Sequence, residues 1–170
     1  VINKNLDTLV SDYEMQNFLS DNEELFKLKA PLFQVRYIHL PPDNVDQFEI
    51  QRSFQRFDAY DRKFLDSLSF QFYNFILSDS VWIDKSNLTS TVSFLNRKNL
   101  NKYLRKLKFF KIEDSLGVYL FYLRNYLEKG DIAPSQVVKT TIKNIILNRR
   151  KIKFIKKFEK DILHDAIKSK

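Results

Sequence analysis

Few residues in this 170-residue chain could do acid–base or metal chemistry. The sequence contains two histidines, His39 and His164, and no cysteine. The lack of cysteine excludes thiolate catalysis, disulfides and Cys-based zinc sites, and a metal site would need carboxylates that no motif suggests. No nucleophile motif accompanies either histidine, and two glycines do not suffice for a phosphate-cradling loop. We therefore expect no metal and no cofactor. His164 lies in a basic segment and reads as a surface helix residue, which leaves His39 as the candidate for chemistry.

His39 stands near the end of the stretch LFQVRYIHLPP, residues 32–42. Apolar and aromatic residues dominate this run and favour a β-strand. Pro41 and Pro42 then end it, because proline has no N–H to donate to a neighbouring strand. Two interpretations of His39 follow: a polar residue that happens to end a strand, or one member of a reactive cluster on a sheet.

The basic charge of the chain is concentrated near its C-terminus. Residues 133–170 hold 11 Lys/Arg and 3 Asp/Glu, whereas the rest holds 18 of each, so the net charge of +8 belongs to this segment. Its stretch NRRKIKFIKKFEK suits an anionic membrane surface, an acidic polypeptide or nucleic acid. It also suits an amphipathic helix with a core side and a solvated basic side. No nucleic-acid-binding motif accompanies the charge, so nucleic acid is the least expected partner. The candidate basic-surface residues are Arg149, Arg150, Lys153, Lys156 and Lys157.

The N-terminal half reads as helices around the strand that carries His39. Ser11 followed by Glu14 is a capping-box pattern that begins a helix, and Ser20 suggests a restart. After the double proline, Phe residues at three-and-four spacing predict a helical region up to about Leu77. Polar residues over 58–61 divide it in two.

The C-terminal half reads as a short strand in VWID, a helix over about 91–107 and a β-hairpin whose turn contains Gly117. A long helix follows from Pro134. Its expected apolar face, continuous along the helix, consists of Val138, Ile142, Ile145, Ile152, Ile155, Phe158, Ile162 and Ala166. The pattern predicts an α+β fold with a small antiparallel sheet. No run of about 18 apolar residues is present to span a membrane.

Two stretches resemble a known family. VSDYEMQNFLSDNEELFKLKAPLFQVRYIHLP is similar to the entry into a parvulin-type peptidyl-prolyl isomerase domain, and GVYLFYLRNYLEKGDIAPSQVVKTTIKNIILNRRK to its exit. Together they resemble exported folding factors of the SurA and PrsA type, most of all their divergent relatives in Bacteroidetes. The resemblance implies a helical chaperone lobe made of residues 1–31 and 132–170, with a parvulin-like module of residues 32–131 inserted between.

The resemblance also implies a site. Active parvulins carry two histidines on the first and last strands of the sheet; His39 matches the first, whereas Tyr119 stands where the second is expected. We therefore expect a remnant catalytic site of His39 and Tyr119, in which the Tyr119 hydroxyl could hydrogen-bond His39. Trp82 and Phe121 are candidate peptide-binding residues, and Trp82 is alternatively a core anchor.

The function implied is that of an exported folding factor that binds unfolded or extended polypeptide, with outer-membrane proteins among its clients. Prolyl isomerase activity is expected to be weak or absent, and an active parvulin-type isomerase is the alternative. The implied location is the periplasm or cell envelope. Because the sequence begins VINKNLDTLV, we expect that a signal or lipid anchor has been removed.

Overall fold

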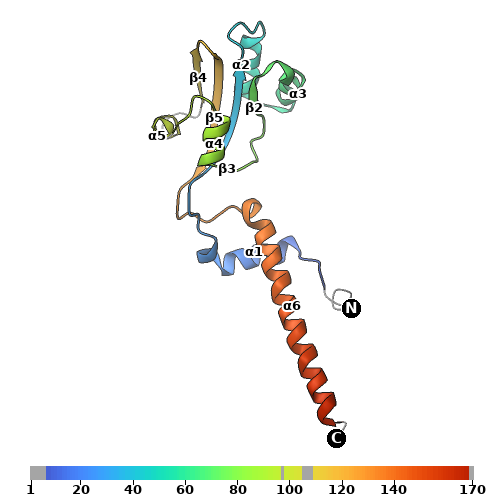
Figure 1. Cartoon of the computed structure of the whole chain (residues 1–170). Helices are drawn as coiled ribbons and strands as arrows, with labels where there is room; N and C mark the ends of the chain where they lie inside the picture. Colours follow the sequence, from blue (N-terminus) through green and yellow to red (C-terminus); the bar gives the residue numbers. More distant parts are fainter. Residues whose placement is uncertain (1–6, 97, 105–108, 169–170) are drawn as a thin grey trace. The chain divides into compact units, whose positions relative to one another are not determined.

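The chain divides into two compact units, which are described separately. Unit 1 combines Val1–Leu28 with Asp131–Lys170, and unit 2 is the continuous segment Lys29–Gly130. The computed structural model describes residues 7–96, 98–104 and 109–168. Helices and a small antiparallel sheet together confirm the α+β class (Figure 1).

The described part of unit 2 is built on a five-stranded sheet. Its strands are β1 (Leu32–Leu40), β2 (Asn74–Ile76), β3 (Ile83–Asp84), β4 (Phe109–Asp114) and β5 (Gly117–Leu127). The order is β2-β1-β5-β4, and β3 pairs with the beginning of β1. All pairs are antiparallel. The register of β1 against β5 runs from Leu32 opposite Leu127 to Leu40 opposite Val118, with one irregularity after Gln34.

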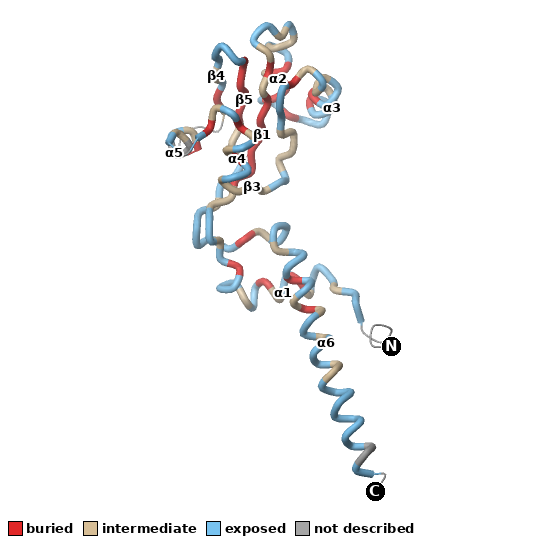
Figure 2. The backbone as a smooth tube through the Cα atoms, in the orientation of Figure 1, coloured by how far each residue is buried: buried red, intermediate tan, exposed pale blue. Residues whose placement is uncertain are grey.

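Successive side chains of a strand point to opposite faces of the sheet. Helices pack against the apolar side chains of both faces. Tyr37 of β1 and Phe121 of β5 pack with Leu88 of α4 (Lys85–Thr91) and with Leu104 of α5 (Leu100–Leu104). On the other face, Ile38 and Leu120 pack with α2 (Gln47–Arg56), α3 (Ala59–Ser67) and the turn after η3 (Ser69–Gln71). The buried residues of unit 2 therefore gather along β1 and β5 (Figure 2).

Unit 1 is a pairing of helices from the two ends of the chain. Its elements are α1 (Asp12–Asp21), η2 (Glu23–Phe26) and α6 (Ser135–Lys168). Met15 and Leu19 of α1 bury against Ile142 and Ile146 of α6, with Phe26 closing the cluster. A ten-residue helix has little stability alone, so this apolar contact stabilises α1.

Several predicted elements are confirmed. Ser11 is the N-cap of α1, and its hydroxyl accepts a hydrogen bond from the Glu14 N–H at 3.1 Å. The helical region after the double proline divides as expected: α2 ends at Arg56, its C-cap Phe57 has a φ of 53°, and the Asp58 carboxylate caps α3. The hairpin of β4 and β5 and the helix after Pro134 are also present.

Other element predictions were wrong. The region around Phe75 forms β2 rather than the end of a helix, because β1 offers an edge with which it pairs. The helix expected over 91–107 is replaced by α4, which ends at Thr91, and the short α5; residues 97 and 105–107 lie outside the described part. The restart is a 3₁₀ turn that begins at Glu23 after Asn22, without a Ser20 cap.

Candidate functional site

The sheet of unit 2 places His39 and Tyr119 directly opposite each other on β1 and β5. Their rings stack with centroids 4.3 Å apart, and the Tyr73 ring meets the His39 ring edge-on at 5.0 Å. Both residues of the expected remnant site are therefore together. Tyr73, which follows η3, is an additional neighbour that the sequence did not single out.

The polar atoms of His39 and Tyr119 form hydrogen bonds with the β4–β5 turn and not with each other. The His39 Nε2 donates a hydrogen bond to the Leu116 carbonyl oxygen at 3.1 Å. The Tyr119 hydroxyl donates to the Asp114 carboxylate at 3.2 Å. The expected hydrogen bond between His39 and Tyr119 is thus replaced by ring stacking, because Asp114 captures the hydroxyl.

Burial limits what Tyr119 can contact. The residue is only 1% exposed, whereas His39 is half-buried. Burial raises the pKa of Tyr119, and the nearby Asp114 carboxylate raises it further. The phenol is therefore neutral at physiological pH, and the accessible part of this pair is the His39 ring.

Gly117 brings the turn and the His39 strand close together. Its φ of +146° suits glycine, and a Cβ placed there would lie 2.2 Å from the Leu40 carbonyl oxygen and 2.8 Å from the His39 Nε2. The Asp114 carboxylate also accepts from the N–H groups of Leu116 and Gly117. The close approach of Gly117 and the hydrogen bonds to Asp114 therefore hold the β4–β5 turn against the His39 ring.

The two candidate peptide-binding residues have different surroundings. Phe121 is fully buried against the rings of Phe94 and Phe110, on a central strand, and its role in peptide binding stays a prediction. Trp82 immediately precedes β3 and is half-buried. It is not a member of the buried clusters formed by the described residues, so its role in peptide binding stays a prediction.

Arg36 is a buried cation that the sequence analysis missed. It is 4% exposed on β1, with its guanidinium 3.9 Å from the centre of the Phe57 ring and 4.3 Å from that of Tyr122. Its Nη1 donates to the Phe54 carbonyl oxygen at 2.6 Å, and its Nε lies 2.9 Å from the Asp79 carboxylate. Burial lowers the pKa of Arg36, and the Asp79 charge opposes this effect.

The basic residues of α6 separate into two groups. Arg150 donates to the carbonyl oxygens of Asp7 and Leu9 and to the Glu14 carboxylate at 2.6 to 2.9 Å, so it fastens the start of α1 to α6. The Arg149 guanidinium lies 4.7 Å from the centre of the Phe18 ring.

Lys153, Lys156 and Lys157 form the second group. All three are exposed. Among the described residues none of them forms an ion pair of the kind that Arg150 makes. Their charges therefore face solvent.

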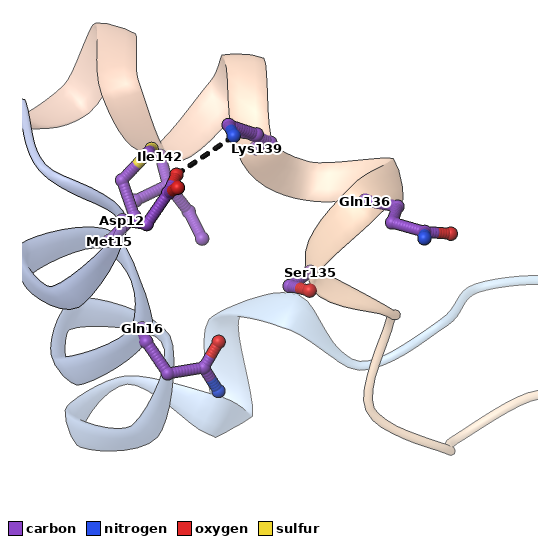
Figure 3. Close-up of a pocket in the computed structure, with 7 residues that line it drawn as sticks. All are labelled: Asp12, Met15, Gln16, Ser135, Gln136, Lys139 and Ile142. Atoms are coloured by element: carbon purple, nitrogen blue, oxygen red, sulfur yellow. Dashed lines mark hydrogen bonds and ion pairs between the residues drawn. The ribbon is translucent and has the colours of Figure 1, made fainter.

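Three hollows lie between α1 and α6. The first has a volume of about 210 Å³ and contains the Asp12–Lys139 ion pair, with Gln16 on the α1 side and Ser135 on the α6 side (Figure 3). Lys139 lowers the pKa of Asp12 through this hydrogen bond and its charge. The other two, of about 330 and 250 Å³, share Phe18 and Ile146 in their walls.

The two hollows around Phe18 have apolar floors with charges of opposite sign at their edges. One is lined by Tyr13 and Asp21, and the other by Arg149 and Lys153. This pattern suits a bound polypeptide segment with an apolar side chain and mixed polar neighbours. The sequence signal for it is the spacing of Phe18 after Met15, which the sequence analysis did not use.

Comparison with known proteins adds the following. A comparison of the sequence with protein-family models finds no match, and a comparison with curated proteins finds none either. Among solved structures, the chain is similar to one from Campylobacter jejuni, from work describing the virulence factor PEB4 and the periplasmic protein Cj1289 as structurally related SurA-like chaperones. The identity is 16% and the TM-score is 0.35. The alignment covers 96% of this chain and 64% of that one, so the chain spans less than two thirds of its length.

Proposed function

We propose that this protein binds unfolded or extended polypeptide in the manner of a chaperone, with weak or no prolyl isomerase activity. The observation that carries the proposal is the row of hollows between α1 and α6 in unit 1. Met15, Phe18 and Ile146 contribute apolar surface to them. In this proposal unit 1 is the chaperone lobe and unit 2 a degenerate isomerase module.

The composition of the hollows supports binding with little sequence preference. Gln16, Ser135 and Gln136 line the first, and Asn17 lines the second. Side-chain amides and hydroxyls both donate and accept hydrogen bonds, so they suit the backbone N–H and C=O groups of any extended segment. Small apolar pockets take its side chains one at a time, which tolerates many sequences.

The geometry around His39 supports weak or absent isomerase activity. Rotation about a prolyl bond has a barrier of about 20 kcal/mol, and lowering it requires polar groups free to act on the twisting amide. The His39 Nε2 is engaged by Leu116, and Tyr119 is buried. His39 could therefore act on a prolyl bond only after its hydrogen bond to Leu116 is broken.

Client binding can be tested by aggregation of a chemically unfolded protein diluted into buffer, followed by light scattering. We expect the wild-type chain to suppress scattering and Tyr13→Ser to suppress it severalfold less. Tyr13 is 78% exposed, so its loss leaves the fold intact. Tyr60→Ser is the matched control, because Tyr60 is 73% exposed but belongs to α3 of unit 2. Failure of the folded wild type to suppress aggregation would contradict the proposal.

An active parvulin-type isomerase is the second candidate, favoured by the stacked His39 and Tyr119 rings at the expected strand positions. A protease-coupled assay on Xaa-Pro peptides of varied Xaa separates the two. We expect no acceleration by wild type and no change in His39→Ala. Acceleration that disappears in His39→Ala would make His39 a catalytic residue and favour the second candidate.

The cellular location and clients are part of the same proposal. A location in the periplasm or cell envelope, with outer-membrane polypeptides among the clients, rests on the resemblance in the sequence. Fractionation of cells that express the full-length protein, with antibody detection, tests the location. Recovery in the cytosolic fraction would contradict it.

A further inference from the structure

The helix α6 carries apolar residues on two opposite sides along its length. In its first half, Val138, Ile142 and Ile146 pack toward α1. An α-helix turns about 100° per residue, so a side chain eighteen positions later returns to the same face. Lys160 stands eighteen positions after Ile142 and therefore lies on the α1 side. Phe158 stands sixteen positions after Ile142 and projects from roughly the opposite side.

The second apolar side is exposed to solvent in the described structure. Phe158 is 54% exposed and Ile162 51%. Figure 2 draws most of the second half of α6 as exposed. The rings of Phe154 and Phe158 lie parallel with centroids 6.5 Å apart, one turn of helix from each other. This side is thus an exposed apolar stripe, instead of the continuation of the core face that the sequence predicted.

Lysines occupy the other side of the same segment. By the same rotation, Lys156, Lys157 and Lys160 lie within about 60° of the Ile142 direction. All three are exposed. Lys151 projects among the apolar residues, where its long aliphatic stem can extend while the ammonium reaches the edge. Residues 151–162 are therefore mainly cationic on one side and mainly apolar on the other, and the exposed Leu163 lies at the edge of the cationic side.

We propose that this half of α6 binds flat on the surface of an anionic lipid bilayer. Phe154, Ile155, Phe158 and Ile162 would face the acyl chains, and the lysines would face the headgroups, an arrangement typical of interfacial amphipathic helices. Among the described helices, none is long and apolar enough to cross a membrane. The proposed contact therefore lies along the bilayer surface.

Charge complementarity favours lipid over a second copy of the chain. Residues 148–168 hold 8 Lys/Arg and 3 Asp/Glu. Two such helices packed through their apolar stripes would enclose two copies of Lys151, which projects among the apolar residues, and like charges within one interface are unfavourable. Anionic headgroups neutralise the same charges and attract them. The contact does not depend on client binding, because the hollows between α1 and α6 use different residues.

The test is flotation of the whole chain with vesicles. We expect binding to phosphatidylcholine vesicles that contain a quarter phosphatidylglycerol, weaker binding in high salt, and no binding to pure phosphatidylcholine. Phe158→Trp in a Trp82→Phe background places the only tryptophan on the apolar stripe. Its emission should shift to the blue when anionic vesicles are added.

Variants assign the contact to this segment. Lys156→Gln, Lys157→Gln and Lys160→Gln should each weaken partitioning about fivefold. Lys143→Gln is the control, an exposed lysine on the first half of α6, and should change it less than twofold. Phe158→Asp should abolish binding without loss of helical circular dichroism, because its side chain points away from α1.

Two results would overturn the proposal. One is failure of the folded wild type to bind anionic vesicles at low salt, or equal binding by Phe158→Asp. The other is a dimer in sedimentation equilibrium that Phe158→Asp dissociates, with no binding to vesicles. That result would assign the apolar stripe to a second copy of the chain.

Discussion

Replacement of Gly117 by alanine tests whether the β4–β5 turn is fixed against β1. A Cβ at this position would lie 2.2 Å from the Leu40 carbonyl oxygen, a backbone atom of a central strand that cannot move without disturbing the sheet. The backbone φ of +146° adds strain for any residue with a side chain. Strain of this kind costs about 1–3 kcal/mol, and overpacking costs about as much again. We expect Gly117→Ala to lower the free energy of unfolding of unit 2 by about 4 kcal/mol.

Gly130→Ala is the matched control for this prediction. Gly130 also has a positive φ, +99°, but a Cβ added there would meet no atom within 4 Å. Gly130→Ala should therefore lower the free energy of unfolding only by the backbone strain, about 1 kcal/mol. Urea unfolding followed by the fluorescence of Trp82, the single tryptophan, reports on unit 2. An effect of Gly117→Ala no larger than that of Gly130→Ala would refute the close approach of the turn to the strand.

Three further predictions concern buried charge and the packing of unit 1. The Arg56 guanidinium holds the pKa of the buried Asp61 carboxyl well below its usual range. A lowered folded-state pKa stabilises the fold above the unfolded value of about 3.9 and loses this effect as pH falls below it. Asp61→Asn should therefore cost about 2 kcal/mol at pH 7 and flatten the loss of stability between pH 4 and 2 in urea titrations. Arg36→Ala should cost about 3 kcal/mol, because it removes a buried side chain packed on the Phe57 and Tyr122 rings and leaves the largely buried Asp79 carboxylate with Arg124 alone; a loss below 1 kcal/mol would contradict this. Ile142→Ala should cost about 3 kcal/mol in unit 1, seen as faster hydrogen exchange in α1, and exchange at the wild-type rate would argue against the α1–α6 core.

The strands that carry the candidate site could be predicted because their signals are local. β1 is a run of β-formers ended by two prolines, and the hairpin is marked by Gly117. Two strands of known direction place His39 and Tyr119 across from each other. Whether the Tyr119 hydroxyl meets His39 or Asp114 depends on how the turn folds back, and that information is not present in the spacing.

The element predictions that were wrong concern segments whose structure depends on contacts between residues distant in the sequence. Phe72 and Phe75 have helical spacing, but β2 forms because β1 leaves an unpaired edge beside it. Asp84 caps α4 through the Asn87 N–H, a local signal that was overlooked when VWID was interpreted only as a strand. On α6 the spacing suggested a single face, since Ile152 follows Ile145 by seven positions, yet α1 is too short to cover the second half.

Because unit 1 is built from the two ends of the chain, it can fold only after unit 2 has been synthesised. Unit 2 is continuous and is complete once residue 130 has left the ribosome. By contrast, α1 is synthesised about 110 residues before α6 begins at Ser135. At roughly 5–20 residues per second, Met15 and Leu19 remain without their partners for about 6–20 s. During that interval the nascent chain exposes an apolar helix segment of its own, so a protein proposed to shield unfolded chains has to pass through such a state itself.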